Sequence, residues 1–212
     1  ALKGKSVLTL FYEPSTRTRS SFEVAAERLS ADVTNFTVST SSVVKGESVQ
    51  DTIATLQAMK VDYVIVRHYN SGLPNVIARH TNASVVNAGD WSHAHPSQAL
   101  LDSFTIREMF PDVRGRRVLI VGDILHSRVA RSTSILMKRL GMEVAYLGPG
   151  SLVPRTEYSG IPRFSDFNEA FAWKPDVIYL LRVQKERQDA PFFPSAREYN
   201  KIYGVTEERL KR

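Results

Sequence analysis

The chain has 212 residues, 42% of them apolar and 24% charged, which is the balance of a globular protein with a sizeable core. It contains no cysteine, which excludes disulfides and thiolate–zinc sites, and no apolar run reaches the ~20 residues of a membrane span. The net charge of +6 comes from basic residues dispersed among acidic ones, so we expect small anionic partners in the cytoplasm rather than nucleic acid or a membrane.

Short apolar runs typical of buried strands alternate with helical patterns along the chain, which predicts an α/β fold with parallel strands. The predicted strands are 7–11, 33–38, 63–66, 84–90, 118–123, 144–147 and 176–181. The helix-breaking string Phe110-Pro111-Asp112 predicts a boundary between two domains, residues 1–110 and 111–212.

The segment after the first predicted strand, Tyr12 to Arg19, has a distinctive polar pattern. Pro14 ends the strand, and Ser15 and Thr16 are residues that favour helix N-caps. Backbone N–H groups at a helix start, the helix dipole and the guanidinium of Arg17 together predict a site for a phosphate dianion. An ordinary capped helix with exposed arginines is the alternative.

Three further segments of the first half carry polar residues beside predicted strands. Residues 39–46 form a polar loop, which by itself is typical of solvated surface. Arg67 follows the third strand at its carboxyl end, where ligands bind in open α/β sheets. His93 to Gln98 lead into a helix whose apolar side we expect to consist of Leu100, Leu101, Phe104 and residues 106–109. Since no acidic or thiol ligand stands at metal spacing from the histidines, we expect no metal.

The second half repeats the strand–loop–helix pattern. Residues 118–123 form a β-run, and residues 124–132 begin a helix without the G-x-G-x-x-G spacing of a dinucleotide site. Arg182 and Gln184 follow the last strand. A guanidinium fork and an amide two residues apart suit a carboxylate, whereas an ammonium group would need acceptors.

Taken in order, these segments resemble the motifs of the transcarbamoylase family over nearly all of the chain. Glu13 to Arg19, followed by Ser21-Phe22-Glu23, resembles the carbamoyl-phosphate signature, and His95 to Gln98 resembles the substrate-carbonyl motif. Residues 124–132 are similar to the aspartate-site loop. Arg182-Val183-Gln184 resembles the bacterial aspartate carbamoyltransferase catalytic chains, since ornithine carbamoyltransferases place a different motif there.

The resemblance implies the transcarbamoylase fold and the transfer of a carbamoyl group from carbamoyl phosphate to L-aspartate. The products are N-carbamoyl-L-aspartate and phosphate, in de novo pyrimidine biosynthesis, and no cofactor or metal is implied. No side chain is an obvious general base, and the departing phosphate is the candidate proton acceptor. The implied site residues are Ser15, Thr16, Arg17 and Thr18 for phosphate; Thr18, Arg67 and His95 for the oxyanion; Gln98 for the carbamoyl NH₂; and Arg128, Arg182 and Gln184 for the aspartate carboxylates.

The resemblance further implies a homotrimer with shared active sites, in which the loop with Ser41 and Lys45 enters the neighbouring subunit's site. Some family members also assemble with dihydroorotase or a regulatory chain, and the residues leave this open. Family chains have a helix before Val7 and a tail after Arg212, so we expect both domains to be incomplete at the chain termini. The alternatives are a truncated or inactive subunit that acts as a phosphate-binding scaffold, and a carbamoyltransferase for another amino acid such as ornithine.

Overall fold

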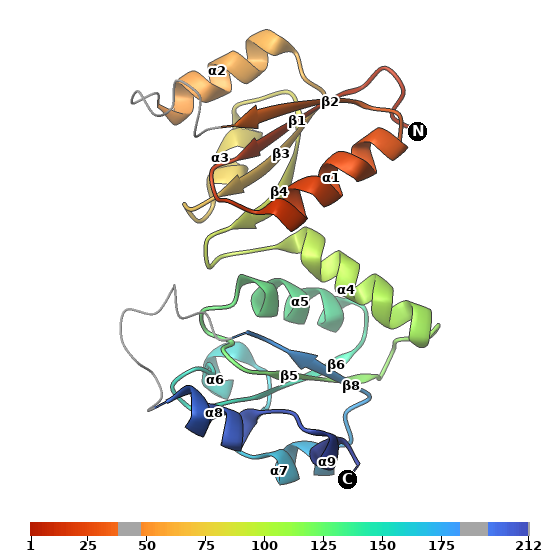
Figure 1. Ribbon diagram of the computed structural model, residues 1–212, viewed down its shortest axis with the longest axis vertical. Helices are drawn as coiled ribbons and strands as arrows, with labels where there is room; N and C mark the ends of the chain where they lie inside the picture. Colours follow the sequence, from red (N-terminus) through yellow and green to blue (C-terminus); the bar gives the residue numbers. More distant parts are fainter. Residues whose placement is uncertain (38–47, 183–194, 212) are drawn as a thin grey trace. The chain divides into compact units, whose positions relative to one another are not determined.

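The computed structural model describes residues 1–37, 48–182 and 195–211 (Figure 1). The chain divides into two compact units, Ala1–Ser97 and Gln98–Arg212. Each unit is a parallel sheet with helices on both faces, which confirms the predicted fold class. No helix in these ranges is long and apolar enough to cross a membrane.

The first unit has the strand order β2-β1-β3-β4, and all neighbouring strands are parallel. Its strands are β1 (Ser6–Phe11), β2 (Asp32–Thr37), β3 (Tyr63–His68) and β4 (Ser84–Asp90). Helix α1 (Thr16–Arg28) covers one face of the sheet, and helices α2 (Val49–Met59) and α3 (Leu73–Arg79) cover the other. Alternation along β1 explains both cores, because Leu8 and Leu10 face α2 and α3 while Val7 faces α1.

The second unit has the order β7-β6-β5-β8 and is also parallel throughout. Its strands are β5 (Arg117–Val121), β6 (Glu143–Leu147), β7 (Arg163–Phe164) and β8 (Val177–Leu180). Helices α4 (Pro96–Met109) and α5 (Arg128–Arg139) contribute to the core on one face, and α7 (Phe167–Ala172) and α8 (Ala196–Tyr203) to the core on the other (Figure 1). The short helices α6 (Thr156–Ser159) and α9 (Glu207–Leu210) complete the described elements.

In each unit, the strand that comes first in the sequence lies inside the sheet, with later strands on both sides of it. In the first unit β2 lies on one side of β1 and β3 on the other, and in the second unit β6 and β8 flank β5 in the same way. In the first unit, the connections that leave the carboxyl ends of β1 and β3 therefore run to opposite sides of the sheet, to β2 and β4. Ligands of open α/β sheets bind at such switch points.

Helix α4 differs from its sequence prediction. It buries Ala99, Ser103 and Ile106, of which only Ile106 was predicted, whereas the predicted residues Leu100, Leu101 and Phe104 are 61%, 56% and 64% exposed. The buried residues also recur at helical spacing, and Ile106 packs in the core of the second unit with residues of the following segment and strand. Packing against the sheet therefore buries the side of α4 that carries Ala99, Ser103 and Ile106, and leaves the side with Leu100, Leu101 and Phe104 exposed.

The same helix affects the division of the chain. The two compact units divide in the first turn of α4, between Ser97 and Gln98, whereas the sequence places the domain boundary after the helix, at residues 110–111. The assignment of α4 to the second unit follows from the packing of Ile106 and Phe110 there. The boundary at residues 110–111 stays a prediction.

Candidate active site

The polar segment after β1 leads directly into the first turn of α1. Ser15 occupies the N-cap position, as predicted, but within the described residues its side chain makes no capping hydrogen bond. The first turn contains no acidic residue, and Arg17 in that turn is exposed. The helix start thus has backbone N–H groups, hydroxyl groups and a guanidinium without a competing carboxylate in that turn, which is the composition of an anion site.

Arg67 lies at the end of β3, where its backbone is in register with Phe11 of β1. Its Nη2 is 3.0 Å from Oε2 of Glu13, and the two side chains are only 11% and 16% exposed. Its Nη1 donates to the backbone oxygen of Ala88 in β4, at 3.1 Å. The guanidinium is therefore fixed between the segment after β1 and the end of β4.

His95 is buried, and its Nδ1 lies 3.2 Å from the hydroxyl oxygen of Ser97. The loop that leads to it is held by Asp90, which is fully buried at the end of β4. One Asp90 oxygen accepts from the backbone N–H of Ala94 at 2.9 Å, and the other lies 2.8 Å from Nδ1 of His93. Asp90 therefore fixes the backbone from which His95 extends.

The balance of burial and hydrogen bonding keeps Asp90 charged. Burial alone would raise the pKa of this carboxyl, but hydrogen bonds from Asn87, Gly72 and His93 outweigh it, so the pKa is lowered. The distances are 3.0 Å from Nδ2 of Asn87 and 2.7 Å from the Gly72 N–H. Asp90 was not predicted as a site residue, although it lies only three positions before His93 of the predicted histidine motif.

His68, the last residue of β3, packs against the segment that follows β1. Its ring is 2% exposed and contacts the ring of Tyr12 in a T-shaped arrangement, with centroids 4.3 Å apart. Its Nδ1 accepts from the Asn70 N–H at 2.7 Å. Burial lowers its pKa to about 4, although the charge of Glu13 acts in the opposite direction. A neutral His68 therefore packs against the segment that carries the polar motif.

In the second unit, Arg128 is the first residue of α5 and is 4% exposed. Ser127 caps the helix, because its hydroxyl oxygen accepts from the Ala130 N–H at 3.1 Å. The preceding turn is fixed by Asp123, which is fully buried and accepts from the backbone N–H of His126 at 3.2 Å. The sequence leading to Arg128 thus forms a rigid turn at the carboxyl end of β5.

Arg182 leaves the neighbouring strand on the same edge of the sheet. Leu180 of β8 is in register with Val121 of β5, and the Leu181 N–H donates to the Val121 oxygen at 2.9 Å. Arg182 follows directly and is exposed. The segments that carry Arg128 and Arg182 thus leave the sheet at the β5–β8 switch point.

Gln98 also belongs to the second unit. Its Nε2 donates to Oδ1 of Asp102 at 2.9 Å, and the hydroxyl of Tyr179 donates to Oδ2 of the same carboxylate at 2.5 Å. Neither Asp102 nor Tyr179 was predicted as a site residue. Three predicted site residues, Ser41, Lys45 and Gln184, lie outside the described residues.

The predicted residues thus form two groups, one in each unit. The first unit contributes Ser15, Thr16, Arg17, Thr18, Arg67 and His95, and the second contributes Gln98, Arg128 and Arg182. Glu13 is a further residue of the first group; it belongs to the predicted carbamoyl-phosphate signature, but its pairing with Arg67 was not predicted. Arginine forks at both edges suit ligands with phosphate or carboxylate groups.

Comparison with known proteins relates this arrangement to a family. The family model described as "Aspartate/ornithine carbamoyltransferase, carbamoyl-P binding domain" matches residues 1–108. The chain is 96% identical over 212 residues to the aspartate carbamoyltransferase catalytic subunit of Akkermansia muciniphila, covering 69% of that protein. The chain belongs to the aspartate carbamoyltransferase catalytic subunits. This confirms the predicted family and enzyme class.

Other aspartate carbamoyltransferases are also similar to this chain. The catalytic subunit of Endomicrobium trichonymphae is 56% identical over 210 residues, and the chain covers 67% of it. The solved aspartate transcarbamoylase of Trypanosoma cruzi in complex with carbamoyl phosphate has a TM-score of 0.84 and 30% identity, with 99% of this chain and 70% of that chain covered. The chain thus spans about two thirds of the length of these relatives.

Proposed function

We propose that the protein containing this chain transfers the carbamoyl group of carbamoyl phosphate to the amine of L-aspartate, using the residues of both switch points. The observation that carries the proposal is the placement of arginines at both carboxyl edges in a member of the aspartate carbamoyltransferase family. Carbamoyl phosphate brings a phosphate group, and aspartate brings two carboxylates. Each is a ligand that guanidinium forks bind well.

The first unit binds carbamoyl phosphate. The first turn of α1, with Ser15, Thr16, Arg17 and Thr18, holds the phosphate through backbone N–H groups, hydroxyls and one guanidinium. Arg67, fixed by Glu13, contacts both the phosphate and the carbonyl oxygen. Thr18, Arg67 and His95 donate to the oxyanion that develops when the carbonyl carbon becomes tetrahedral.

The second unit binds aspartate. Arg128 and Arg182, with Gln184, hold the two carboxylates and direct the amine towards the carbonyl carbon. The amine nitrogen forms a bond to that carbon, the bond from carbon to the phosphate oxygen breaks, and the departing phosphate accepts the proton released by the amine. Gln98 accepts a hydrogen bond from the carbamoyl NH₂ and so orients the carbonyl group.

The working form is a cytoplasmic homotrimer in which Ser41 and Lys45 contribute to the site of a neighbouring subunit. Lysine presents a compact, mobile charge that suits closure over two anionic ligands. Head-to-tail contacts of this kind produce closed rings when the rotation closes. Assembly with dihydroorotase or a regulatory chain is a further possibility that the family resemblance raises.

The test is an assay of product formation with the full-length protein. With carbamoyl phosphate, L-aspartate should give N-carbamoyl-L-aspartate, and L-ornithine should give much less product. Preference for ornithine would overturn the roles of Arg128 and Arg182. Phosphate binding without any product would favour the inactive scaffold instead.

A further inference from the structure

Three side chains in the second unit form a continuous hydrogen-bonded chain, the Gln98–Asp102–Tyr179 chain. Nε2 of Gln98 lies 2.9 Å from Oδ1 of Asp102, and the hydroxyl of Tyr179 lies 2.5 Å from Oδ2 of Asp102. Gln98 and Asp102 lie one turn apart on α4, while Tyr179 lies on β8, 77 positions from Asp102. All three side chains are partly buried.

The chemistry of these groups leaves one orientation for the Gln98 amide. An ionised carboxylate only accepts hydrogen bonds, so the glutamine has to present its NH₂ group to Asp102. A flipped amide would place its carbonyl oxygen against the carboxylate, with a lost hydrogen bond and a repulsive contact. The carbonyl oxygen of Gln98 is therefore the end of the amide that is not directed at Asp102.

Tyr179 fixes the carboxylate in turn. Its backbone is in register with Ile120 of the central strand β5, so the hydroxyl is mounted on the sheet itself. Burial, followed by the hydrogen bond and the charge of Asp102, raises the pKa of Tyr179, so the hydroxyl keeps its proton and remains a donor. Tyr179 occupies one oxygen of Asp102 and leaves the other for Gln98.

We propose that Asp102 and Tyr179 are positioning residues that orient the Gln98 amide, so that its carbonyl oxygen receives the NH₂ group of carbamoyl phosphate. The inference rests on the proposed function, in which Gln98 contacts that group. Tyr179 stands three positions before Arg182, so the strand that leads to the proposed aspartate-binding arginine also anchors the carbamoyl-binding amide.

The alternative is a purely structural role, since Gln–Asp pairs four residues apart also stabilise isolated helices. A structural role would affect all ligands of the site alike. A positioning role would affect only ligands that have the NH₂ group. Acetyl phosphate separates the two, because it has a methyl group in place of that NH₂ and is otherwise similar in shape and charge.

The test compares the apparent affinities of the full-length protein for carbamoyl phosphate and acetyl phosphate, measured by kinetics and competition. Tyr179→Phe and Asp102→Asn should each lower the ratio of the two affinities roughly fivefold, the effect of one ordinary hydrogen bond. Gln98→Ala should lower it at least as much. Adding Tyr179→Phe to Gln98→Ala should cause no further fall, because both act through the same contact.

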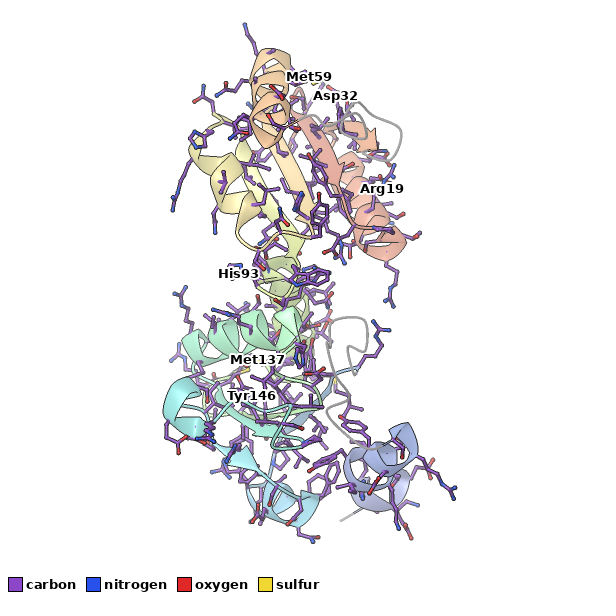
Figure 2. All side chains as sticks on the ribbon, turned by 90° about the vertical axis from the view of Figure 1, so that its left-hand side faces the viewer. Arg19, Asp32, Met59, His93, Met137 and Tyr146 are labelled. Atoms are coloured by element: carbon purple, nitrogen blue, oxygen red, sulfur yellow. The ribbon has the colours of Figure 1, made fainter. Side chains whose placement is uncertain are left out.

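Tyr146→Phe is the matched control. The Tyr146 hydroxyl is also in the second unit and donates to Oγ of Ser134 at 2.9 Å, and its ring packs in the core that includes Met137 (Figure 2). This variant loses a buried tyrosine hydrogen bond on β6, which β5 separates from β8, and should leave the ratio unchanged. Comparing Tyr179→Phe with Tyr146→Phe therefore separates a general loss of packing from a loss of amide orientation.

The outcomes separate the proposed role of Gln98 from the positioning role of Asp102 and Tyr179. An unchanged ratio in Gln98→Ala would overturn the proposed role of Gln98 and the positioning role with it. A lowered ratio in Gln98→Ala, together with a Tyr179→Phe variant that behaves like Tyr146→Phe or adds fully to Gln98→Ala, would overturn the positioning role alone.

Discussion

Individual arginines differ in how firmly the protein holds them. Arg67 and Arg128 are nearly buried, whereas Arg17 and Arg182 are exposed. A buried guanidinium keeps one orientation only if it is paired, and Glu13 provides that pairing for Arg67. We infer that Arg67 is oriented before substrate arrives, while Arg17 and Arg182 adopt their final positions on binding.

Glu13→Gln tests the orientation of Arg67. It removes the charge that lies 3.0 Å from the guanidinium but keeps the shape of the side chain. A hydrogen bond between charged groups contributes about 1.5–3 kcal/mol, so we expect carbamoyl transfer to fall roughly tenfold to a hundredfold. Steady-state kinetics of the full-length protein measure this.

Glu23→Gln is the control for that variant. Glu23 also pairs with an arginine, Arg19 at 2.7 Å, but within one helix and with greater exposure. It should retain nearly full activity, because such pairs contribute only about 0.3–0.5 kcal/mol. Equal activity of Glu13→Gln and Glu23→Gln would remove Glu13 from the site.

At the scale of elements, the end of β3 combines a site residue with a buried histidine. Arg67 extends to the site, and the adjacent His68 packs among aromatic rings with a pKa of about 4, well below the usual 6.5. Between these two values the unfolded chain binds a proton at His68 that the folded chain does not bind. The free energy of unfolding must therefore decrease as the pH falls through this window.

We expect His68 to account for roughly 2–3 kcal/mol of lost stability between pH 7 and pH 4, from about 1.4 kcal/mol per pKa unit. Urea denaturation at several pH values measures it. His68→Asn cannot be protonated and should lack this part of the pH dependence. His80→Asn, which replaces an exposed histidine, should retain it. Equal pH dependence in both variants would contradict the assignment.

Elements that are defined by local pattern could be predicted from the sequence. Val118 to Val121 is buried on both faces of its sheet and is a continuous apolar run, so its strand was predictable. The extension of β3 through Arg67 and His68 was not, because polar residues there are held by tertiary contacts. Helix α3, which follows a short turn and begins with Leu73-Pro74, was also not predicted.

The residues of the candidate site could also be predicted only in part. Motif residues such as Ser15 and His95 could be predicted, because their order along the chain resembles that of the family. The pairing of Glu13 with Arg67 and of Tyr179 with Asp102 joins positions far apart in the chain, so no local pattern encodes it. These contacts required the structure.

At the scale of the whole molecule, the proposed trimer has a direct test. Arg17→Ala and Lys45→Gln should each be nearly inactive in the full-length protein. If Lys45 enters a neighbouring subunit's site, mixed and reassembled trimers should regain activity, since one interface then combines an intact Arg17 with an intact Lys45. Mixing without subunit exchange is the control. Hybrids as inactive as that control would place Lys45 in its own subunit's site or in none.

The central claim is that the phosphate of carbamoyl phosphate binds in the first unit and the carboxylates of aspartate bind in the second. The most direct measurement is the Michaelis constant for each substrate in Arg17→Ala and Arg182→Ala, with Arg28→Ala, at the other end of α1, as the control. Arg17→Ala should raise the constant for carbamoyl phosphate roughly tenfold or more, and Arg182→Ala that for aspartate, each with a much smaller effect on the other substrate. Equal changes for both substrates in both variants, or the reverse pattern, would contradict this division.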